Sequence, residues 1–204
     1  MRIFIVLLFS IKILAAQKVV KKSIIAPEIT AINIDVNNCF ELSLRTTDSE
    51  EMVLEATIDG EYKKDLVLNT EQEGNTILVS SGFQPIFKNP NDKLSAHKVI
   101  SVALEITLPE YKSVTVYGTN CNVAVQGRYR NLKVTLDDGT CRINQVSESV
   151  EVNTQSGDII VHAEKAKIEA SSRYGNIERD TIAIGDDEYN VTTVTGEIRI
   201  NKTD

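Results

Sequence analysis

Apolar and polar residues recur with a long, fixed period in the C-terminal half of the chain. Five segments align with one another, beginning at Ser113, Asn131, Ser149, Lys167 and Glu188. Their starting points are 18 residues apart three times and 21 residues apart the last time. Each segment contains two pairs of apolar residues, and the members of a pair are two positions apart. This spacing places both side chains of a pair on one face of a short β-strand.

Four columns of this alignment are apolar with few exceptions, and one further column holds a turn residue, most often glycine. A single unit of this kind cannot bury its apolar face, whereas stacked copies share a core. The pattern therefore predicts an all-β fold with a single parallel β-solenoid (a β-helix-like structure) of about 18-residue coils over residues 113–201. The columns are Val114, Leu132, Val150, Ile168 and Tyr189; Val116, Val134, Val152, Ala170 and Val191; Val123, Cys141, Ile159, Ile177 and Ile198; Val125, Ile143, Val161 and Ile200, which Arg179 interrupts; and the turn column of Cys121, Gly139, Gly157, Gly175 and Gly196.

The N-terminal half alternates between apolar and polar residues without a regular repeat. The longest alternation runs from Ile100 to Leu108, and Glu73-Gly74-Asn75 has the composition of a hairpin turn. We predict an irregular antiparallel β region over residues 24–109 that caps the open end of the solenoid. The segment from Val36 (VNNCFEL) is similar to the segment from Gly118 (GTNCNVAV), which indicates an early, diverged coil.

The first residues have the layout of a secretory signal peptide. Arg2 precedes an apolar run, and the small residues Ala15 and Ala16 stand before Gln17. This run is shorter than the roughly 20 apolar residues that a membrane-spanning helix needs. We therefore expect residues 1–16 to be a cleaved signal peptide and residues 17–204 to be one exported domain. The expected location is the periplasm, the cell surface or the medium, with no membrane span after cleavage.

The charge of the chain restricts its partners. The formal net charge is −7 at pH 7, and 42% of the residues are hydrophobic, as in a globular protein. An acidic surface repels phosphate backbones, so nucleic acid is not an expected partner. The basic residues Lys18, Lys21 and Lys22 depart from this trend, and we interpret them as part of a solvated linker behind the cleavage site.

The repeat, the signal peptide and the acidic bias together resemble the putative-adhesin family of bacterial exported proteins. The coils that carry this resemblance are Leu132 to Ile143, Val150 to Val161 and, more loosely, Ile168 to Ile177. The resemblance extends over roughly residues 29–202. It implies a single parallel β-solenoid and an envelope location, but no catalytic residues. The turn residue Cys121 departs from the glycine that is usual in this family.

The sequence contains few residues suited to catalysis. There are two histidines, His97 and His162, and neither accompanies a recognisable nucleophile motif or metal-ligand spacing. Some solenoids are polysaccharide lyases, which use clustered carboxylates to bind calcium and a basic residue to accept a proton. The dense acidic clusters are Asp137-Asp138 and Asp186-Asp187-Glu188, and both are explained by connecting turns.

The three cysteines form a separate candidate site. Cys39 and Cys121 both follow an asparagine in the turn position. If their segments stack on each other, these two residues lie at a distance that suits a disulfide. The prediction is a Cys39–Cys121 disulfide with Cys141 buried and free. The alternative is that all three thiols are buried, inert and reduced.

From these features we expect a non-catalytic exported envelope protein, an adhesin-like binding or scaffold module without a cofactor. Its partner at the envelope or cell surface is unknown. The final coil, at Ile198 to Ile200, would leave a free sheet edge through which two copies could form an edge-mediated homodimer. The alternative function is a carbohydrate-active β-solenoid enzyme such as a polysaccharide lyase.

Overall fold

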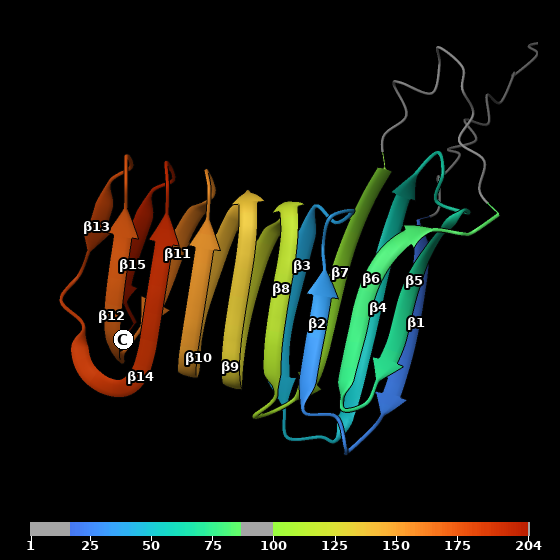
Figure 1. Ribbon diagram of the computed structural model, residues 1–204, viewed down its shortest axis with the longest axis horizontal. Helices are drawn as coiled ribbons and strands as arrows, with labels where there is room; N and C mark the ends of the chain where they lie inside the picture. Colours follow the sequence, from blue (N-terminus) through green and yellow to red (C-terminus); the bar gives the residue numbers. More distant parts are fainter. Residues whose placement is uncertain (1–16, 87–99, 204) are drawn as a thin grey trace, which may run out of the picture.

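The computed structural model describes residues 17–86 and 100–203, and these ranges contain β-strands but no helix (Figure 1). The predicted all-β fold is confirmed. No helix in the described part of the chain could cross a membrane. The predicted signal peptide, residues 1–16, lies outside the described residues. The strands are β1 (Lys18–Ile25), β2 (Ala31–Asp35), β3 (Glu41–Thr47), β4 (Glu51–Gly60), β5 (Leu66–Glu73), β6 (Thr76–Phe83), β7 (Ile100–Pro109), β8 (Ser113–Asn120), β9 (Asn122–Asp138), β10 (Thr140–Thr154), β11 (Asp158–Ala163), β12 (Lys165–Ser172), β13 (Ile177–Arg179), β14 (Ala183–Thr193) and β15 (Ile198–Lys202).

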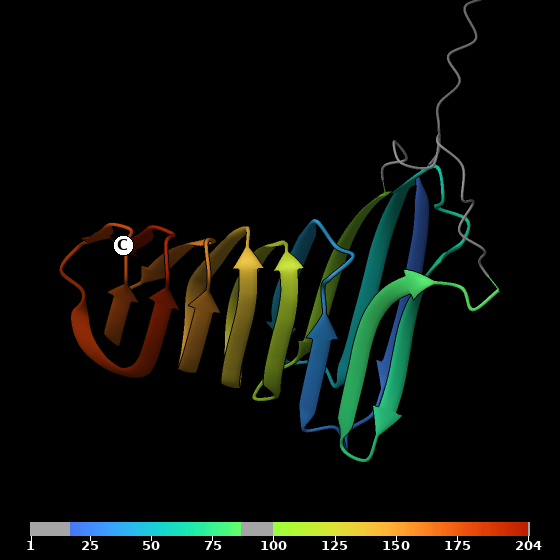
Figure 2. The same ribbon diagram turned by 45° about the horizontal axis from the view of Figure 1, so that its top comes forward.

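These strands form one mixed sheet that is folded back on itself into two layers (Figures 1 and 2). The first layer runs β1-β4-β7-β3-β9-β10-β11-β15-β13. The second layer runs β5-β6-β2-β8-β9-β10-β14-β12. The strands β9 and β10 are long, with 17 and 15 residues, and each contributes to both layers. The apolar core lies between the layers.

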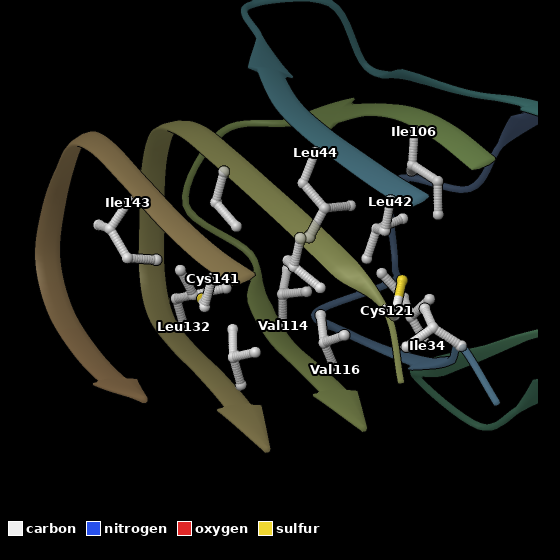
Figure 3. Close-up of a cluster of buried hydrophobic side chains, with 14 of the residues drawn as sticks. Ile34, Leu42, Leu44, Ile106, Val114, Val116, Cys121, Leu132, Cys141 and Ile143 are labelled. Carbon is white, nitrogen blue, oxygen red and sulfur yellow. The ribbon is translucent and has the colours of Figure 1, made fainter. Parts of the chain in front are cut away.

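The apolar columns of the sequence alignment are in register across neighbouring strands. Leu132 in β9 pairs with Val114 in β8 and with Val150 in β10, and all three strands are parallel. In the other layer Cys141 of β10 pairs with Val123 of β9. These residues are at most 1% exposed, and Figure 3 shows side chains from successive strands packed into one core.

The order of the coils in space differs from their order in the sequence. The segment from Glu188 lies between the segments from Ser149 and Lys167, because β14 pairs with both β10 and β12. In the other layer β15 likewise lies between β11 and β13. Ile198 to Ile200 is therefore an interior strand, and the prediction that it forms the free edge is wrong. At this end of the fold, the sheet edges available to an edge-mediated homodimer are β12 and β13.

Apolar content explains why the segment from Lys167 takes the end position. Ile177 is 39% exposed, and the exposed Arg179 occupies a column that is apolar in the other coils. By contrast, Ile198 and Ile200 of the last segment are almost fully buried. The chain reaches the outer coil first and then returns past Lys165, where a Cβ on Gly185 would lie 2.8 Å from the Lys165 carbonyl oxygen. This detour accounts for the longer spacing of the last repeat.

The glycines of the turn column pack directly against one another. A Cβ on Gly157 would lie 2.5 Å from the Gly139 carbonyl oxygen, and one on Gly196 would lie 2.2 Å from that of Gly157. Gly175 meets Gly196 in the same way, as the coil order requires. A positive φ, which glycine adopts without strain, occurs within this column at Gly139 alone, with φ 100°. Close approach of neighbouring turns is the more general requirement.

The N-terminal half is mixed rather than wholly antiparallel as predicted. The strands β1, β4 and β7 are antiparallel, and β5 and β6 form the predicted hairpin around Gly74. In contrast, β2 and β3 are parallel to β8 and β9, which is the strand pairing that the predicted diverged coil requires. Its turn is one residue longer than the next one, since Asp35 pairs with Tyr117 but Glu41 pairs with Asn122.

Lys18, Lys21 and Lys22 belong to strand β1 and not to a linker. The Nζ atom of Lys18 donates to the Leu66 carbonyl oxygen at 2.7 Å, and that of Lys22 donates to the Leu68 carbonyl oxygen at 2.5 Å. Both acceptors lie on β5, the edge strand of the other layer. The alternating pattern of β1 places both lysines on its inner side, where they bridge the two sheet edges and cover the open end.

Candidate binding groove

An open polar groove lies at the end of β3, beside the corner where β9 and β10 bend from one layer to the other. Its volume is about 770 Å³. Most of its wall consists of charged, amide and hydroxyl side chains. Among the lining residues are Arg45, Asp48, Glu110, Gln126, Arg128, Gln145 and Ser147.

Irregular backbone at this corner creates the groove. The pairing of β9 with β10 shifts register after Asn144, and Gln145 has a positive φ of 48°. Gly127 has φ 119°, and a Cβ at this position would lie 2.0 Å from Thr46 Oγ1. The Arg128 backbone N–H donates to the same Thr46 Oγ1 at 2.9 Å. Thr46 and Gly127 thus join the β3 corner to the β9 corner.

Two buried tyrosines support the floor of the groove. The Tyr129 hydroxyl donates to the Gln126 carbonyl oxygen at 3.1 Å, and the Tyr189 hydroxyl donates to the Val146 carbonyl oxygen. Burial raises the pKa of both phenols, so both remain neutral donors at physiological pH. Their hydrogen bonds satisfy backbone carbonyls that the bulges remove from the regular strand ladder.

The groove contains side chains that are free to bind a ligand. Arg128 pairs with Glu110 at 3.6 Å. In the described part of the chain, Arg45 has no ion-pair partner, and neither Gln126 nor Gln145 has a side-chain hydrogen bond. Both amides can donate and accept, and a guanidinium presents a planar fork of donors. The described lining residues include no histidine or cysteine. Such a set suits hydrogen bonding to a polar ligand rather than nucleophilic catalysis.

The catalytic and metal-binding candidates of the sequence do not converge on this groove. His97 lies outside the described residues, and His162 is a partly exposed residue of β11. Asp137-Asp138 ends β9, and in β14 Asp187 accepts a hydrogen bond from the backbone N–H of Glu148 at 2.7 Å. Among residues 17–86 and 100–203, no group of three acidic, histidine or cysteine side chains is arranged to hold a metal ion.

The three cysteines lie in the core as buried free thiols. The Cys39 Sγ atom is 3.5 Å from Ser81 Oγ. Burial, followed by the charge of Cys39, raises the pKa of Cys121 to about 12, and burial raises that of Cys141 to about 12. The strand register sets Phe40 rather than Cys39 opposite Cys121, because the Asn122 N–H donates to the Phe40 carbonyl oxygen. The Cys39–Cys121 disulfide stays a prediction.

Sequence reasoning missed the groove, although the alignment contained a signal for it. The position directly after the fourth apolar column reads Gln126, Asn144, His162 and Asn201 in the coils that keep this column apolar. Such a column of large polar side chains on strands is a more specific indicator of a binding surface than polar residues in turns. The corner bulges that open the groove, however, have no comparable pattern in the sequence.

Comparison with known proteins shows a likeness of fold. Neither a known protein family nor a curated protein matches the sequence. A putative cell adhesion protein from Clostridium sporogenes superposes with a TM-score of 0.64 at 16% identity, covering 92% of this chain and 100% of that chain. This chain therefore shares the fold of that protein.

Two further structures are more distant. A putative adhesin from Bacteroides fragilis has a TM-score of 0.40 at 14% identity, covering 92% of this chain and 98% of that chain. A putative lipid binding protein from Parabacteroides distasonis has a TM-score of 0.30 at 15% identity, covering 88% of this chain and 96% of that chain. These similarities are too low for conclusions about function.

Proposed function

We propose that the chain is an exported, non-catalytic, adhesin-like module that acts at the cell surface and binds its partner in the groove at Arg45. The observation that carries this proposal is the groove itself. It joins an unpaired guanidinium and free amides on a corner that buried tyrosines support, and it is open to solvent. The shared fold with the Clostridium sporogenes protein, named a putative cell adhesion protein, supports the same function.

The proposal includes a solenoid architecture and membership in the putative-adhesin family. The parallel pairing of successive coils and the contacts between turn glycines support a parallel β-solenoid over the C-terminal half. A solenoid is a rigid platform, because every coil is hydrogen-bonded to its neighbours. Rigidity favours binding, since little conformational entropy is lost when the partner docks. Residues 1–16 supply the export signal in this proposal.

A carbohydrate-active enzyme such as a polysaccharide lyase is the weaker alternative. Lyase chemistry requires a metal or cationic group that neutralises a carboxylate, together with a base for the sugar proton. Glu110 in the groove is already paired with Arg128. The aspartates proposed from the sequence as calcium ligands are at other positions, on β9 and β14. The groove side chains thus favour binding without turnover.

The binding claim can be tested with the mature chain and surface material from the cells that produce it. We predict saturable binding of fluorescently labelled residues 17–204, weakened about tenfold or more by Arg45→Gln. This estimate corresponds to the roughly 1.5–3 kcal/mol of a hydrogen bond to a charged group. Fluorescence anisotropy against solubilised surface fractions would measure the change.

The matched control is Arg173→Gln, which removes the same charge from an exposed arginine outside the groove. Arg173 follows β12 and lies over the Tyr174 ring, with 5.3 Å between its Cζ atom and the ring centroid. This variant should bind like the unmodified chain. Equal binding by all three proteins would refute the groove as the ligand site.

A further inference from the structure

The groove continues into a ladder of polar side chains along the outer surface of the first layer. Arg45, Gln126, Asn144, His162 and Asn201 pair in register across β3, β9, β10, β11 and β15. All five are exposed or partly exposed. We refer to this row as the polar ladder. It begins at the groove and crosses five neighbouring strands.

The spacing of the ladder identifies a repeating ligand. Neighbouring strands are about 4.8 Å apart, so the five side chains extend over roughly 19 Å. This spacing is close to the length of one pyranose unit in an extended polysaccharide. An extended polypeptide advances only about 3.3 Å per residue and would lose register with the ladder. The amide side chains of Gln126, Asn144 and Asn201 both donate and accept, which suits the hydroxyl groups of sugars.

The charges beside the ladder favour an acidic ligand. The whole chain has a net charge of −7. Neither the ladder nor the column two residues before it contains a carboxylate on these five strands. That second column contains Arg142 and Arg199, and Arg199 pairs with both Glu197 and Glu178. Arg45 and Arg142 have no carboxylate partner among the described residues. The two columns form a locally basic strip on an acidic protein, which attracts anionic groups.

The arginines lie on alternate strands of the ladder. Arg45, Arg142 and Arg199 are on β3, β10 and β15, which are its first, third and fifth strands. Arg142 and Arg199 share a column, so two strand spacings separate them by roughly 10 Å, whereas Arg45 is two residues further along its strand and lies roughly 12 Å from Arg142. In an extended polysaccharide whose rings alternate in orientation, carboxylates that face the same side also recur at every second ring. Arginine and a carboxylate can form a two-pronged hydrogen-bonded ion pair.

We propose that the groove and the polar ladder form one track that binds a linear, carboxylate-bearing polysaccharide. The arginines bind the carboxylates of alternate rings, and the amides bind hydroxyl groups between them. This inference rests on the proposed binding function and specifies its ligand class. Arg142 does not line the groove, so its contribution distinguishes an extended track from a compact site.

The test uses polygalacturonate as the probe and the mature chain as the protein. Binding of galacturonate oligomers of two, four and six units should strengthen with length, because longer oligomers reach more of the ladder. Arg142→Gln should weaken binding of the six-unit oligomer about three- to tenfold at physiological ionic strength, where exposed charges are partly screened. Arg173→Gln should leave binding unchanged. The methyl-esterified polymer, which keeps the backbone but lacks the charges, should bind at least tenfold more weakly.

The opposite results would overturn the track. Equal binding of the methyl-esterified polymer, equally strong binding of polyglutamate, or no effect of Arg142→Gln would each contradict it. If polygalacturonate fails to bind while Arg45→Gln still weakens binding to surface material, the ligand class is wrong and the proposed function stands. Release of unsaturated uronate products, detected by ultraviolet absorbance, would contradict both proposals in favour of a lyase.

Discussion

At the scale of single residues, several buried polar groups of the core donate hydrogen bonds to backbone carbonyls. Tyr129 and Tyr189 donate to backbone carbonyls, and Thr154 donates to the Gly157 carbonyl oxygen at 2.6 Å. The turn asparagine Asn122 accepts a hydrogen bond from the Thr140 N–H at 3.1 Å in the next coil. The bonds of Tyr189 and Asn122 connect neighbouring coils, whereas those of Tyr129 and Thr154 close turns within one coil.

The buried thiols lead to a pH-dependent prediction. Their pKa is raised above the ordinary 9.0, so the native chain keeps protons that the unfolded chain releases. The stabilisation is therefore complete below pH 9 and is lost as pH rises from 9 towards 12. Between pH 9 and 10 the reduced protein should lose about 1 kcal/mol of unfolding free energy for each of Cys121 and Cys141. A Cys39–Cys121 disulfide would leave only Cys141 to contribute.

Urea unfolding at pH 9 and 10, with and without reductant, measures this difference. We predict a loss of roughly 2 kcal/mol from Cys121 and Cys141 in the reduced protein, to which Cys39 adds in the same direction, and roughly 1 kcal/mol from Cys141 alone in a protein with the disulfide. Tyrosine and lysine titrations are the same in both forms and cancel in the comparison. An identical loss in the two forms, together with three free thiols by mass spectrometry, would show that the disulfide does not form.

At the scale of elements, the sequence predicts the coils well but not their order. Apolar columns and turn glycines identify all five coils, because burial imposes a strict two-residue alternation on each strand. Local patterns do not determine which coil follows which in space. Two features of the sequence accompany the exchanged order of the last two coils. Arg179 interrupts an apolar column, and the last interval is 21 residues long instead of 18. These features do not reveal the order by themselves, because both spatial orders of the last two coils satisfy the same local alternation of apolar and polar residues.

The coil order can be tested by hydrogen exchange. Strands β14 and β15 have a neighbour on both sides, whereas β12 and β13 are sheet edges. We therefore predict slower amide exchange in β14 and β15 than in β12 and β13, although they come later in the chain. Mass spectrometry of peptic fragments would resolve the two pairs. Faster exchange in β15 than in β13 would support stacking in sequence order and contradict the observed topology.

The groove could be predicted only in part. The polar column through Gln126 and Asn144 is visible in the repeat alignment. Arg45 could be assigned to this column only after β3 was known to pair with β9. The bulge at Gln145 that opens the groove results from a register shift between β9 and β10. No glycine or proline marks this position in the sequence. Sequence periodicity therefore indicates the ladder but not the cavity at its end.

At the scale of the whole molecule, two features separate the binding surface from the rest. The acidic side chains that flank the basic strip, Glu105 on β7 and Glu178 on β13, lie in register with its two ends. The lysines of β1 cover the opposite end of the fold, away from the ladder. The basic strip is thus narrow, because Glu41, Asp158 and Glu197 occupy the neighbouring outward column, and its limited length suits one segment of a long polymer.

Surface exposure is the most direct test of an adhesin-like function. Intact producing cells would be treated with protease, and the chain would be followed by antibody beside a periplasmic control protein. We predict that the chain is lost while the periplasmic control survives. Survival of both proteins would place the chain inside the envelope and contradict a surface adhesin, leaving a periplasmic binding or scaffold role.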